Sequence, residues 1–437
     1  MELFLKRKLL YVLCALVILI MSGCNSVDDL SGFLVPPQTT EKMKELKSDI
    51  YKLVGSEITF LQPAKGNFRN TINFMDIDSD EEQEAIAVYA PQSGDSVAHI
   101  LVLKNSIGHW AQLIRFSITG IGVDIIEFID YNGDGRKEIV IGVSTKFGDS
   151  KGLSVYDISG SSEKELLTHQ YNYINITPQN EILTISLNKE KSNKASLIVA
   201  DNSLPTVVSE CNLFSQATAI TNIYFGKTEA SPAFFISETL DNVNNLTEII
   251  SLDNKTIKNL TLNNDITLFD SLLKRAGYPY IQDIDNDGVT EISKAIQPNE
   301  TIQQGNENMR IIEWFSFSGN SFNHNMYSII NPNEKYFLVF PEKWLGKVNA
   351  IKETGNQITF YIQNENKEKI NLFSIYSLSP EDWEKKENKV NWSVLKRNEE
   401  RLFALYIYDP LSQYSSMLSI TPAYIENNFF QATFIQK

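Results

Sequence analysis

The sequence predicts a mainly β protein, and two observations support that prediction. From about residue 57 onward, short runs of apolar, β-branched and aromatic residues are separated by clusters of Asn, Asp, Gly and Ser. Runs of this kind, bounded by turn residues, are typical of antiparallel strands. Three acidic loops recur along the same stretch, and each leads into such a run. The clearest predicted strands lie at residues 84–89, 99–103, 138–143 and 153–156.

The three acidic loops have the oxygen-rich spacing of a calcium site, with oxygen side chains at positions 1, 3, 5 and 9. Calcium takes about six to eight oxygen ligands, and alternate residues of a tight loop can point at one centre. Position 6 must turn sharply, which Gly135 and Gly288 allow. The backbone carbonyl at position 7 would add a ligand, from Arg136 or Val289. The predicted ligands are Asp76, Asp78, Asp80 and Glu84 in loop one; Asp130, Asn132, Asp134, Arg136 and Glu138 in loop two; and Asp283, Asp285, Asp287, Val289 and Glu291 in loop three.

An EF-hand is the competing interpretation of these loops. An EF-hand needs a bidentate Glu at position 12 and flanking helices, whereas position 12 here holds Ala87, Ile141 and Lys294. The loops instead resemble the DxDxDGxxE loop of FG-GAP and VCBS-type repeats, over roughly residues 57–330. That resemblance implies an integrin-like β-propeller with structural calcium. Loop one departs from the pattern, with Glu81 in place of glycine, which leaves its metal binding open.

The spacing of the loops predicts the number of repeated units. Asp76 and Asp130 are 54 residues apart, and Asp130 and Asp283 are 153 residues apart, close to three such intervals. Two units without an acidic loop should therefore lie near residues 180 and 230. A unit of about 50 residues accommodates a four-stranded antiparallel sheet, the blade of a propeller. We therefore predict a β-propeller-like array of about five blades over residues 57–333.

Residues 334–437 differ in composition and contain no acidic loop. Strand-like runs at residues 358–362, 372–376 and 402–408 occur together with candidate helical segments at residues 382–386 and 421–429. We predict that this region is a small α+β C-terminal domain.

The N-terminus predicts a lipoprotein signal peptide over residues 1–23. Basic residues precede an uncharged apolar run over residues 9–20. Twelve helical residues span about 18 Å, too short for a hydrocarbon core of about 30 Å. Residues 21–24, Met-Ser-Gly-Cys, resemble the bacterial lipobox, which implies that a diacylglycerol is attached to Cys24. The alternative is ordinary secretion, with a cysteine at this position by chance.

Residues 24–56 are predicted to form a lipidated tether followed by a short helix. The segment after Cys24 is polar and contains Pro36 and Pro37, as expected of a spacer. Apolar residues at helical spacing then predict a helix over residues 41–53, which Gly55 would end.

The acidic balance of the chain restricts its partners. The net charge is −15 and becomes −17 without the signal peptide, which carries three bases and one acid. Nucleic acid is not an expected partner, because phosphate binding needs clustered Lys and Arg. Anionic headgroups would also repel the domain, so membrane contact should come from acyl chains, palmitate among them, at the extracytoplasmic face. Cys211 would be the only other cysteine after processing, which excludes an internal disulfide.

The sequence predicts no catalytic residues. The four histidines are not at metal-ligand spacing, and no nucleophile elbow or phosphate loop is present. The leading prediction is a non-catalytic envelope lipoprotein whose calcium-stabilised β domain presents a binding or assembly surface to an envelope protein or a glycan. Two alternatives stay open: a hydrolase of envelope glycan or exported polysaccharide, which would use two carboxylates, and a stress- or sporulation-linked envelope sensor. The order of anchor, calcium-loop units and C-terminal module resembles uncharacterised lipoproteins of Gram-positive bacteria.

Overall fold

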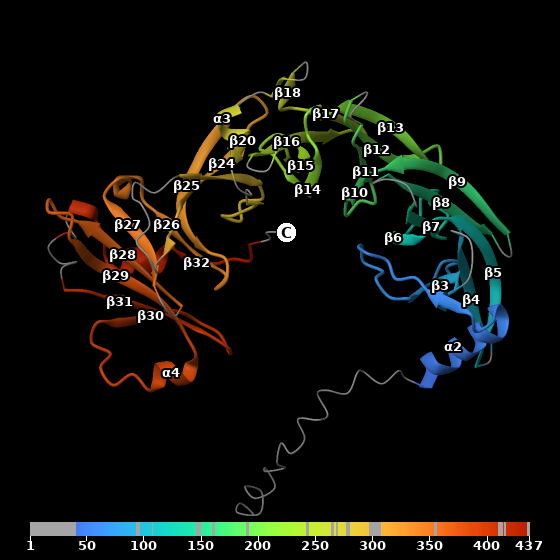
Figure 1. The fold of residues 1–437 in the computed structure, drawn as a ribbon, viewed down its shortest axis with the longest axis horizontal. Coiled ribbons are helices and arrows are strands. Elements are labelled where there is room, and N and C mark those ends of the chain that lie inside the picture. The colour runs from blue at the N-terminus through green and yellow to red at the C-terminus, as the bar shows by residue number, and fades with distance from the viewer. Residues whose placement is uncertain are drawn as a thin grey trace, which may run out of the picture.

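Antiparallel sheets follow one another around an arc in chain order (Figure 1). The computed structural model describes residues 41–434, apart from residues 93–96, 107, 146–149, 160–161, 189–191, 242–243, 264–265, 268–269, 277–279, 297–306, 354–355, 410–413 and 415–416. Within these residues there are six sheets of four or more strands and one short two-stranded sheet. The mainly β, propeller-like fold predicted from the sequence is therefore confirmed.

The first four sheets have the up-and-down order of propeller blades. Sheet one contains β1 (Ile58–Phe60), β2 (Ile72–Met75), β3 (Glu84–Pro91), β4 (Val97–Ser106) and β5 (His109–Thr119). Sheet two contains β6 (Gly122–Ile129), β7 (Glu138–Ser144), β8 (Lys151–Ser159) and β9 (Ser162–Tyr171). Sheet three contains β10 (Tyr173–Ile176), β11 (Ile182–Ser186), β12 (Lys194–Asp201) and β13 (Leu204–Asn212). Sheet four contains β14 (Ala219–Lys227), β15 (Pro232–Thr239), β16 (Asn244–Asp253), β17 (Thr256–Asn259) and β20 (Lys274–Ala276).

Within these sheets the chain runs from the concave to the convex side of the arc. Figure 1 shows β6, β10 and β14 on the inner side, and β5, β9 and β13 on the outer side. Sheets three and four occupy the two predicted units that lack an acidic loop. The repeat interval therefore located these sheets correctly.

The fifth and sixth sheets complete the array. Sheet five contains β21 (Ile281–Gln282), β22 (Glu291–Ile296), β24 (Ile311–Phe317), β25 (Phe322–Asn331), β26 (Tyr336–Phe340) and β32 (Phe429–Gln431). Sheet six contains β23 (Glu307–Asn308), β27 (Val348–Glu353), β28 (Gln357–Gln363), β29 (Lys369–Leu378), β30 (Trp392–Arg397) and β31 (Leu402–Ile407). The short pair is β18 (Leu262–Asn263) with β19 (Ile266–Thr267). The predicted domain boundary at residue 333 falls in the turn between β25 and β26, and the division stays a prediction.

Short helices accompany these sheets. The C-terminal region has η2 (Glu342–Trp344), α4 (Pro380–Glu384) and α6 (Pro422–Asn427), which confirms its α+β character. Thr421 caps α6 by accepting a hydrogen bond from the backbone N–H of Tyr424. Near the start of the chain lies α2 (Glu41–Val54), and beside sheet four lies α3 (Asp270–Leu273).

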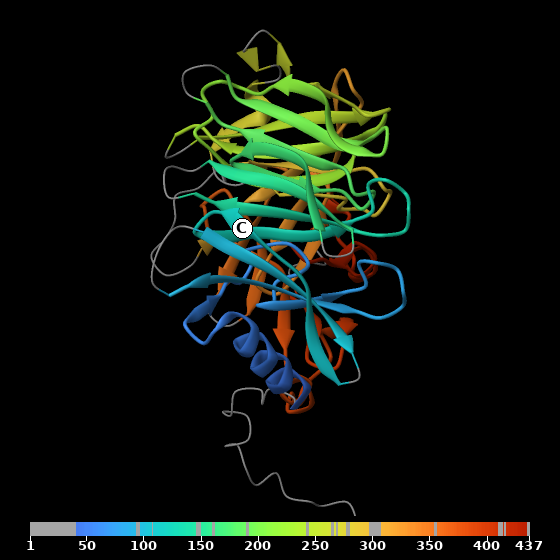
Figure 2. The same ribbon diagram turned by 90° about the vertical axis from the view of Figure 1, so that its right-hand side faces the viewer.

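The core of the protein lies between neighbouring sheets. One apolar cluster joins sheets one and two, the next joins sheets two and three, and the series continues to sheet six. Central strands such as β3 and β7 are consequently buried on both faces. Figure 2 shows the sheets stacked one upon another, with α2 at one end. Leu46 and Ile50 of α2 are buried against sheet one.

The predicted anchor lies outside the described residues. Cys24, the signal peptide and the polar tether all precede residue 41. Within the part of the chain that the structure describes, no helix has both the length and the apolar character needed to cross a membrane. The predicted helix after the tether is confirmed as α2.

Candidate metal centres

The three acidic loops share one backbone conformation. Position 6 has a positive φ in each loop: 73° at Glu81, 89° at Gly135 and 87° at Gly288. A non-glycine residue with a left-handed backbone conformation costs about 1–2 kcal/mol. Glu81 therefore adopts the conformation of the two glycines with a strained backbone. Loop one therefore has the turn of the other two loops although it lacks the glycine.

The first Asp of each loop holds this turn. Asp130 accepts hydrogen bonds from the backbone N–H groups of Gly133 at 2.6 Å and Gly135 at 2.9 Å. Asp76 likewise accepts from the backbone N–H groups at positions 4 and 6 of its loop, and Asp283 from those at positions 5 and 6. These carboxylates are placed by the backbone, as the position-1 ligand of a metal loop would be.

The Glu at position 9 begins a strand in each loop and is buried. Glu84, Glu138 and Glu291 start β3, β7 and β22, with exposed fractions of 0%, 1% and 0%. One carboxylate oxygen of each accepts a hydrogen bond from the backbone N–H at position 2, at 3.0, 2.7 and 3.0 Å. The other oxygen of each glutamate is left to face a different partner in each loop. That partner distinguishes the three sites.

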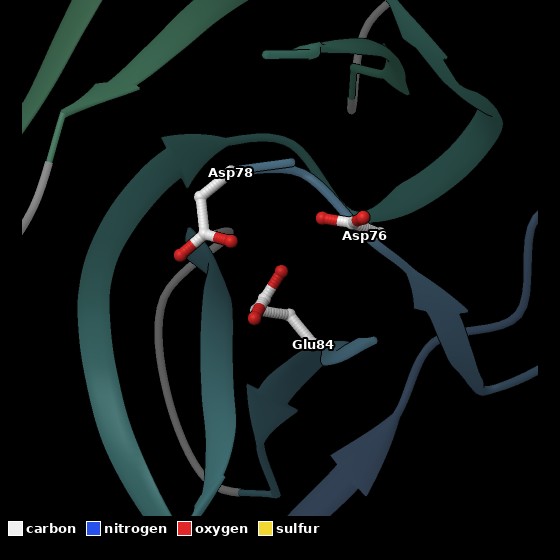
Figure 3. A group of neighbouring side chains, drawn as sticks. All are labelled: Asp76, Asp78 and Glu84. Atoms are coloured by element: carbon white, nitrogen blue, oxygen red, sulfur yellow. The ribbon is translucent and has the colours of Figure 1, made fainter. Parts of the chain in front are cut away.

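In loop one the partner is a lysine. The side chains of Asp76, Asp78 and Glu84 point toward a common centre (Figure 3), and three of their oxygens lie within 4.8 Å of one another. The Lys104 ammonium on β4 donates to Asp78 Oδ2 at 2.7 Å and to Asp80, and lies 3.5 Å from Glu84 Oε1. The hydrogen bonds that Lys104 donates to the Asp78 and Asp80 carboxylates raise the pKa of its ammonium group, so it stays charged.

In loop two the partner is an amide. Asn132 Nδ2 donates to Asp134 Oδ2 at 3.1 Å and to Glu138 Oε1 at 3.3 Å. Arg136 also pairs with Asp134, at 3.0 Å. Burial, followed by the charges of neighbouring acids with Asp157 first among them, raises the pKa of Glu138. Loop two therefore holds its buried carboxylate against a neutral donor rather than a cation.

In loop three the carboxylates have no cation. Oxygens of Asp283, Asp285 and Glu291 lie within 4.8 Å of one another and could hold a metal ion. Glu291 Oε1 accepts only a neutral hydrogen bond, from Asn325 Nδ2 at 3.2 Å. Burial and then the charges of the loop's three aspartates raise the pKa of Glu291 to about 8. Among the described residues, no salt bridge joins a base to this loop.

The loops also connect neighbouring sheets. The Lys137 backbone N–H, at position 8 of loop two, donates to the Ile77 carbonyl of loop one at 2.9 Å, and Ser79 Oγ donates to the Gly135 carbonyl. At position 8 of loop three, the Thr290 N–H donates to the Lys227 carbonyl of β14 at 2.7 Å. Each loop thus lies where two sheets meet, and an ion bound there would stiffen the joint.

The spacing of the acidic residues predicted part of this geometry. Positions 1, 3 and 9 converge in loops one and three, whereas the position-5 acids Asp80 and Asp287 stand outside the two converging groups. The carbonyl ligands proposed for Arg136 and Val289 stay predictions. The sequence reasoning missed Lys104, on the strand beside that of Glu84, and Asn325, on β25, two strands from that of Glu291. Strand register, rather than local spacing, is the signal that identifies them.

A cavity of about 330 Å³ lies beside loop three. It is lined by Tyr224 of β14, by loop-three residues including Asp283, and by the segment from Phe430 to Thr433. Phe430 is 43% exposed and stacks on Phe337 with ring centroids 5.2 Å apart. Among the residues that line this cavity, Asp283 is the only one with a carboxylate, and none is a Lys or Arg.

Comparisons with known proteins add little to this picture. No family model matches the chain, and no curated protein matches it. Among solved structures, the chain is similar to one described as the structure of the Dos1 propeller, with a TM-score of 0.31 and 11% identity. That similarity covers 79% of this chain and 96% of the other. It is too weak to support an argument, and the propeller-like architecture rests on the sheet order given above.

Proposed function

We propose that this protein is a lipid-anchored, non-catalytic envelope protein whose β array is stiffened by calcium at loops two and three and presents a binding surface. The observation that carries the proposal is the arrangement at loop three. There a fully buried carboxylate, Glu291, converges with Asp283 and Asp285, and no base among the residues that the structure describes forms a salt bridge with them. Buried carboxylates that are neither paired nor bound to a metal are costly, so this loop has a strong reason to bind a cation.

Calcium is the cation that suits these loops. The donors are carboxylate, amide and carbonyl oxygens, and no Cys or His belongs to either acidic group. Hard oxygen donors in a flexible loop favour calcium over zinc or copper. The resemblance to FG-GAP and VCBS-type loops supports the same ion. In loop two, a half-turn of the Asn132 amide would direct Oδ1 rather than Nδ2 toward the shared centre.

The cavity beside loop three is the candidate binding surface. It combines the exposed face of Phe430 with hydrogen-bonding groups of Gln282, Gln431 and Thr433. Its lining suits a neutral, hydroxyl-rich ligand such as an envelope glycan, because an apolar ring face and convergent polar groups are what ligand sites combine. A two-carboxylate hydrolase gains no support here, since Asp283 is held by its own loop.

Thermal unfolding tests the calcium proposal directly. The full-length protein, purified in detergent, should melt at a clearly higher temperature in calcium than in a chelator. At a free concentration about 100 times its Kd, each bound ion adds about 2.7 kcal/mol to the free energy of unfolding. Magnesium at the same concentration is the control. An unchanged melting temperature would show that calcium does not stabilise the fold.

Metabolic labelling with a fatty acid tests the anchor. The wild type should incorporate label and fractionate with membranes, whereas Cys24→Ala should do neither. Cys211→Ala is the matched control and should behave like the wild type. A Cys24→Ala variant that stays in the membrane would contradict the lipobox interpretation.

A further inference from the structure

Loop one contains a cation that belongs to the chain itself. Lys104 Nζ reaches Asp78 Oδ2 at 2.7 Å and Glu84 Oε1 at 3.5 Å, and also bonds to Asp80. These are the acids at positions 3, 5 and 9, three of the four side chains predicted to bind calcium in this loop. An ammonium group with three donors can meet three carboxylates from one centre.

The register of the sheets shows where this lysine comes from. In sheet one Ala85 pairs with Leu103, so the next step places Glu84 opposite Lys104. In sheet two Ile139 pairs with Tyr156, and the same step places Glu138 opposite Asp157. In sheet five Ile292 pairs with Phe315, which places Glu291 opposite Ser316.

One structural position thus holds a different residue in each of the three sites. It holds lysine in loop one, aspartate in loop two and serine in loop three. The loops that lack a cation at this position are those left with a buried carboxylate facing a neutral amide. The loop with the cation is also the one that lacks glycine at position 6.

Loop one nevertheless keeps unused acceptors. Glu84 is fully buried, and its Oε1 has no hydrogen-bond partner among the described residues; nor has the buried Asp78 Oδ1. Both belong to the acidic group whose oxygens converge within 4.8 Å. If the ammonium were absent, these oxygens would face one another with nothing to balance their charge.

We propose that Lys104 replaces the calcium ion in loop one, so that this loop is closed without metal, and that removing the ammonium group opens a third site for a divalent cation. The inference rests on the proposed function, because it treats loops two and three as calcium sites. Its consequence is that loop one, which lies where sheets one and two meet, is held closed by a permanent charge pair within sheet one. The loop-three joint, between sheets four and five, depends on free calcium.

Calcium stoichiometry of the full-length protein in detergent tests this inference. Equilibrium dialysis should find two calcium ions on the wild type and three on Lys104→Ser, which copies the residue of loop three. Lys137→Ser is the matched control. Lys137 is a lysine of loop two whose ammonium group donates to the Met75 thioether at 3.1 Å rather than to a carboxylate. Its removal should therefore leave the number of bound calcium ions at two.

The variant Asp78→Asn keeps the test independent of whether Lys104→Ser folds. In the wild-type background it should leave the count at two, because loop one holds no ion to lose. A fall by one ion would overturn the inference, and so would a folded Lys104→Ser that gains none. A wild type that binds no calcium would refute the proposed function instead. In that case, one calcium ion bound by Lys104→Ser would still support the inference. A Lys104→Ser variant that binds no calcium would overturn it.

Discussion

Loops one and three have the same backbone and differ in how they neutralise a buried glutamate. Both hold their position-1 Asp with two backbone N–H groups, and both turn at position 6 with positive φ. Loop one places Lys104 beside its buried carboxylate, whereas loop three places only the Asn325 amide beside Glu291. The backbone therefore places the acidic side chains alike in the two loops, and residues on other strands of the same sheet decide what faces the buried carboxylate.

Sheet four contains a third arrangement. Glu238 and Glu248 are both fully buried in a sheet without an acidic loop. Glu248 accepts hydrogen bonds from the Phe214 N–H at 3.0 Å and from Asn259 Nδ2 at 2.6 Å. Burial and the neighbouring Glu248 raise the pKa of Glu238 well above its ordinary value. The raised pKa favours a proton on Glu238, so the buried glutamates of the three sheets have three different neighbours: a lysine, a candidate cation site and a second glutamate.

Removing the buried carboxylate of loop three should have the largest effect on calcium binding. Glu291→Gln should abolish the loop-three share of the calcium-induced stabilisation, about 2.7 kcal/mol at 100 times the Kd. In a chelator the variant should be more stable than the wild type, because glutamine avoids the cost of burying this carboxylate, whether charged or protonated. Denaturant melts with and without calcium measure both effects. A calcium response equal to that of the wild type would contradict a metal role for Glu291.

Moving the lysine into loop two should convert that loop into a copy of loop one. Asp157→Lys places an ammonium opposite Glu138, the position that Lys104 occupies opposite Glu84. The variant should bind one calcium ion fewer than the wild type and keep most of its stability in chelator. Equilibrium dialysis and a chelator melt measure these outcomes. Asp157→Asn is the control, and an equal loss of calcium in both variants would show that charge removal, rather than the lysine, is responsible.

The sequence predicted what depends on local spacing and missed what depends on register. The strands and the ligand spacing follow from patterns within a few residues, and the two units without acidic loops follow from the regular interval between the loops. Lys104 lies 20 residues beyond Glu84 and meets it only because of how β3 pairs with β4. The return of β32 to β26 in sheet five is likewise a pairing between distant segments. No local pattern identifies such partners, because many registers place an apolar face correctly.

The raised pKa of Glu238 makes a pH prediction for sheet four, and the raised pKa of Glu291 makes one of the same sign for loop three in chelator. A raised folded-state pKa gives stability that is present below the ordinary glutamate pKa and is lost as the pH rises toward the folded value. The wild type in chelator should therefore lose up to about 1.4 kcal/mol per pH unit from each of these groups above the ordinary pKa. Glu238→Gln should remove the share of this slope that Glu238 contributes and leave the share of Glu291. Melts at several pH values measure it, and a variant with the wild-type slope would show that Glu238 is not the group that titrates.

The smallest expected effect concerns the shared backbone itself. Glu81 has a φ of 73°, at the position where loops two and three have glycine. Relief of the left-handed strain is worth about 1–2 kcal/mol, and the extra freedom of glycine in the unfolded chain opposes it by about 0.5–1 kcal/mol. Glu81→Gly should therefore leave stability unchanged or raise it by about 1 kcal/mol, whereas Gly288→Ala should lower it. Since Lys104 remains, Glu81→Gly should not gain a calcium ion. If it did, the missing glycine rather than the lysine would be what closes loop one to metal.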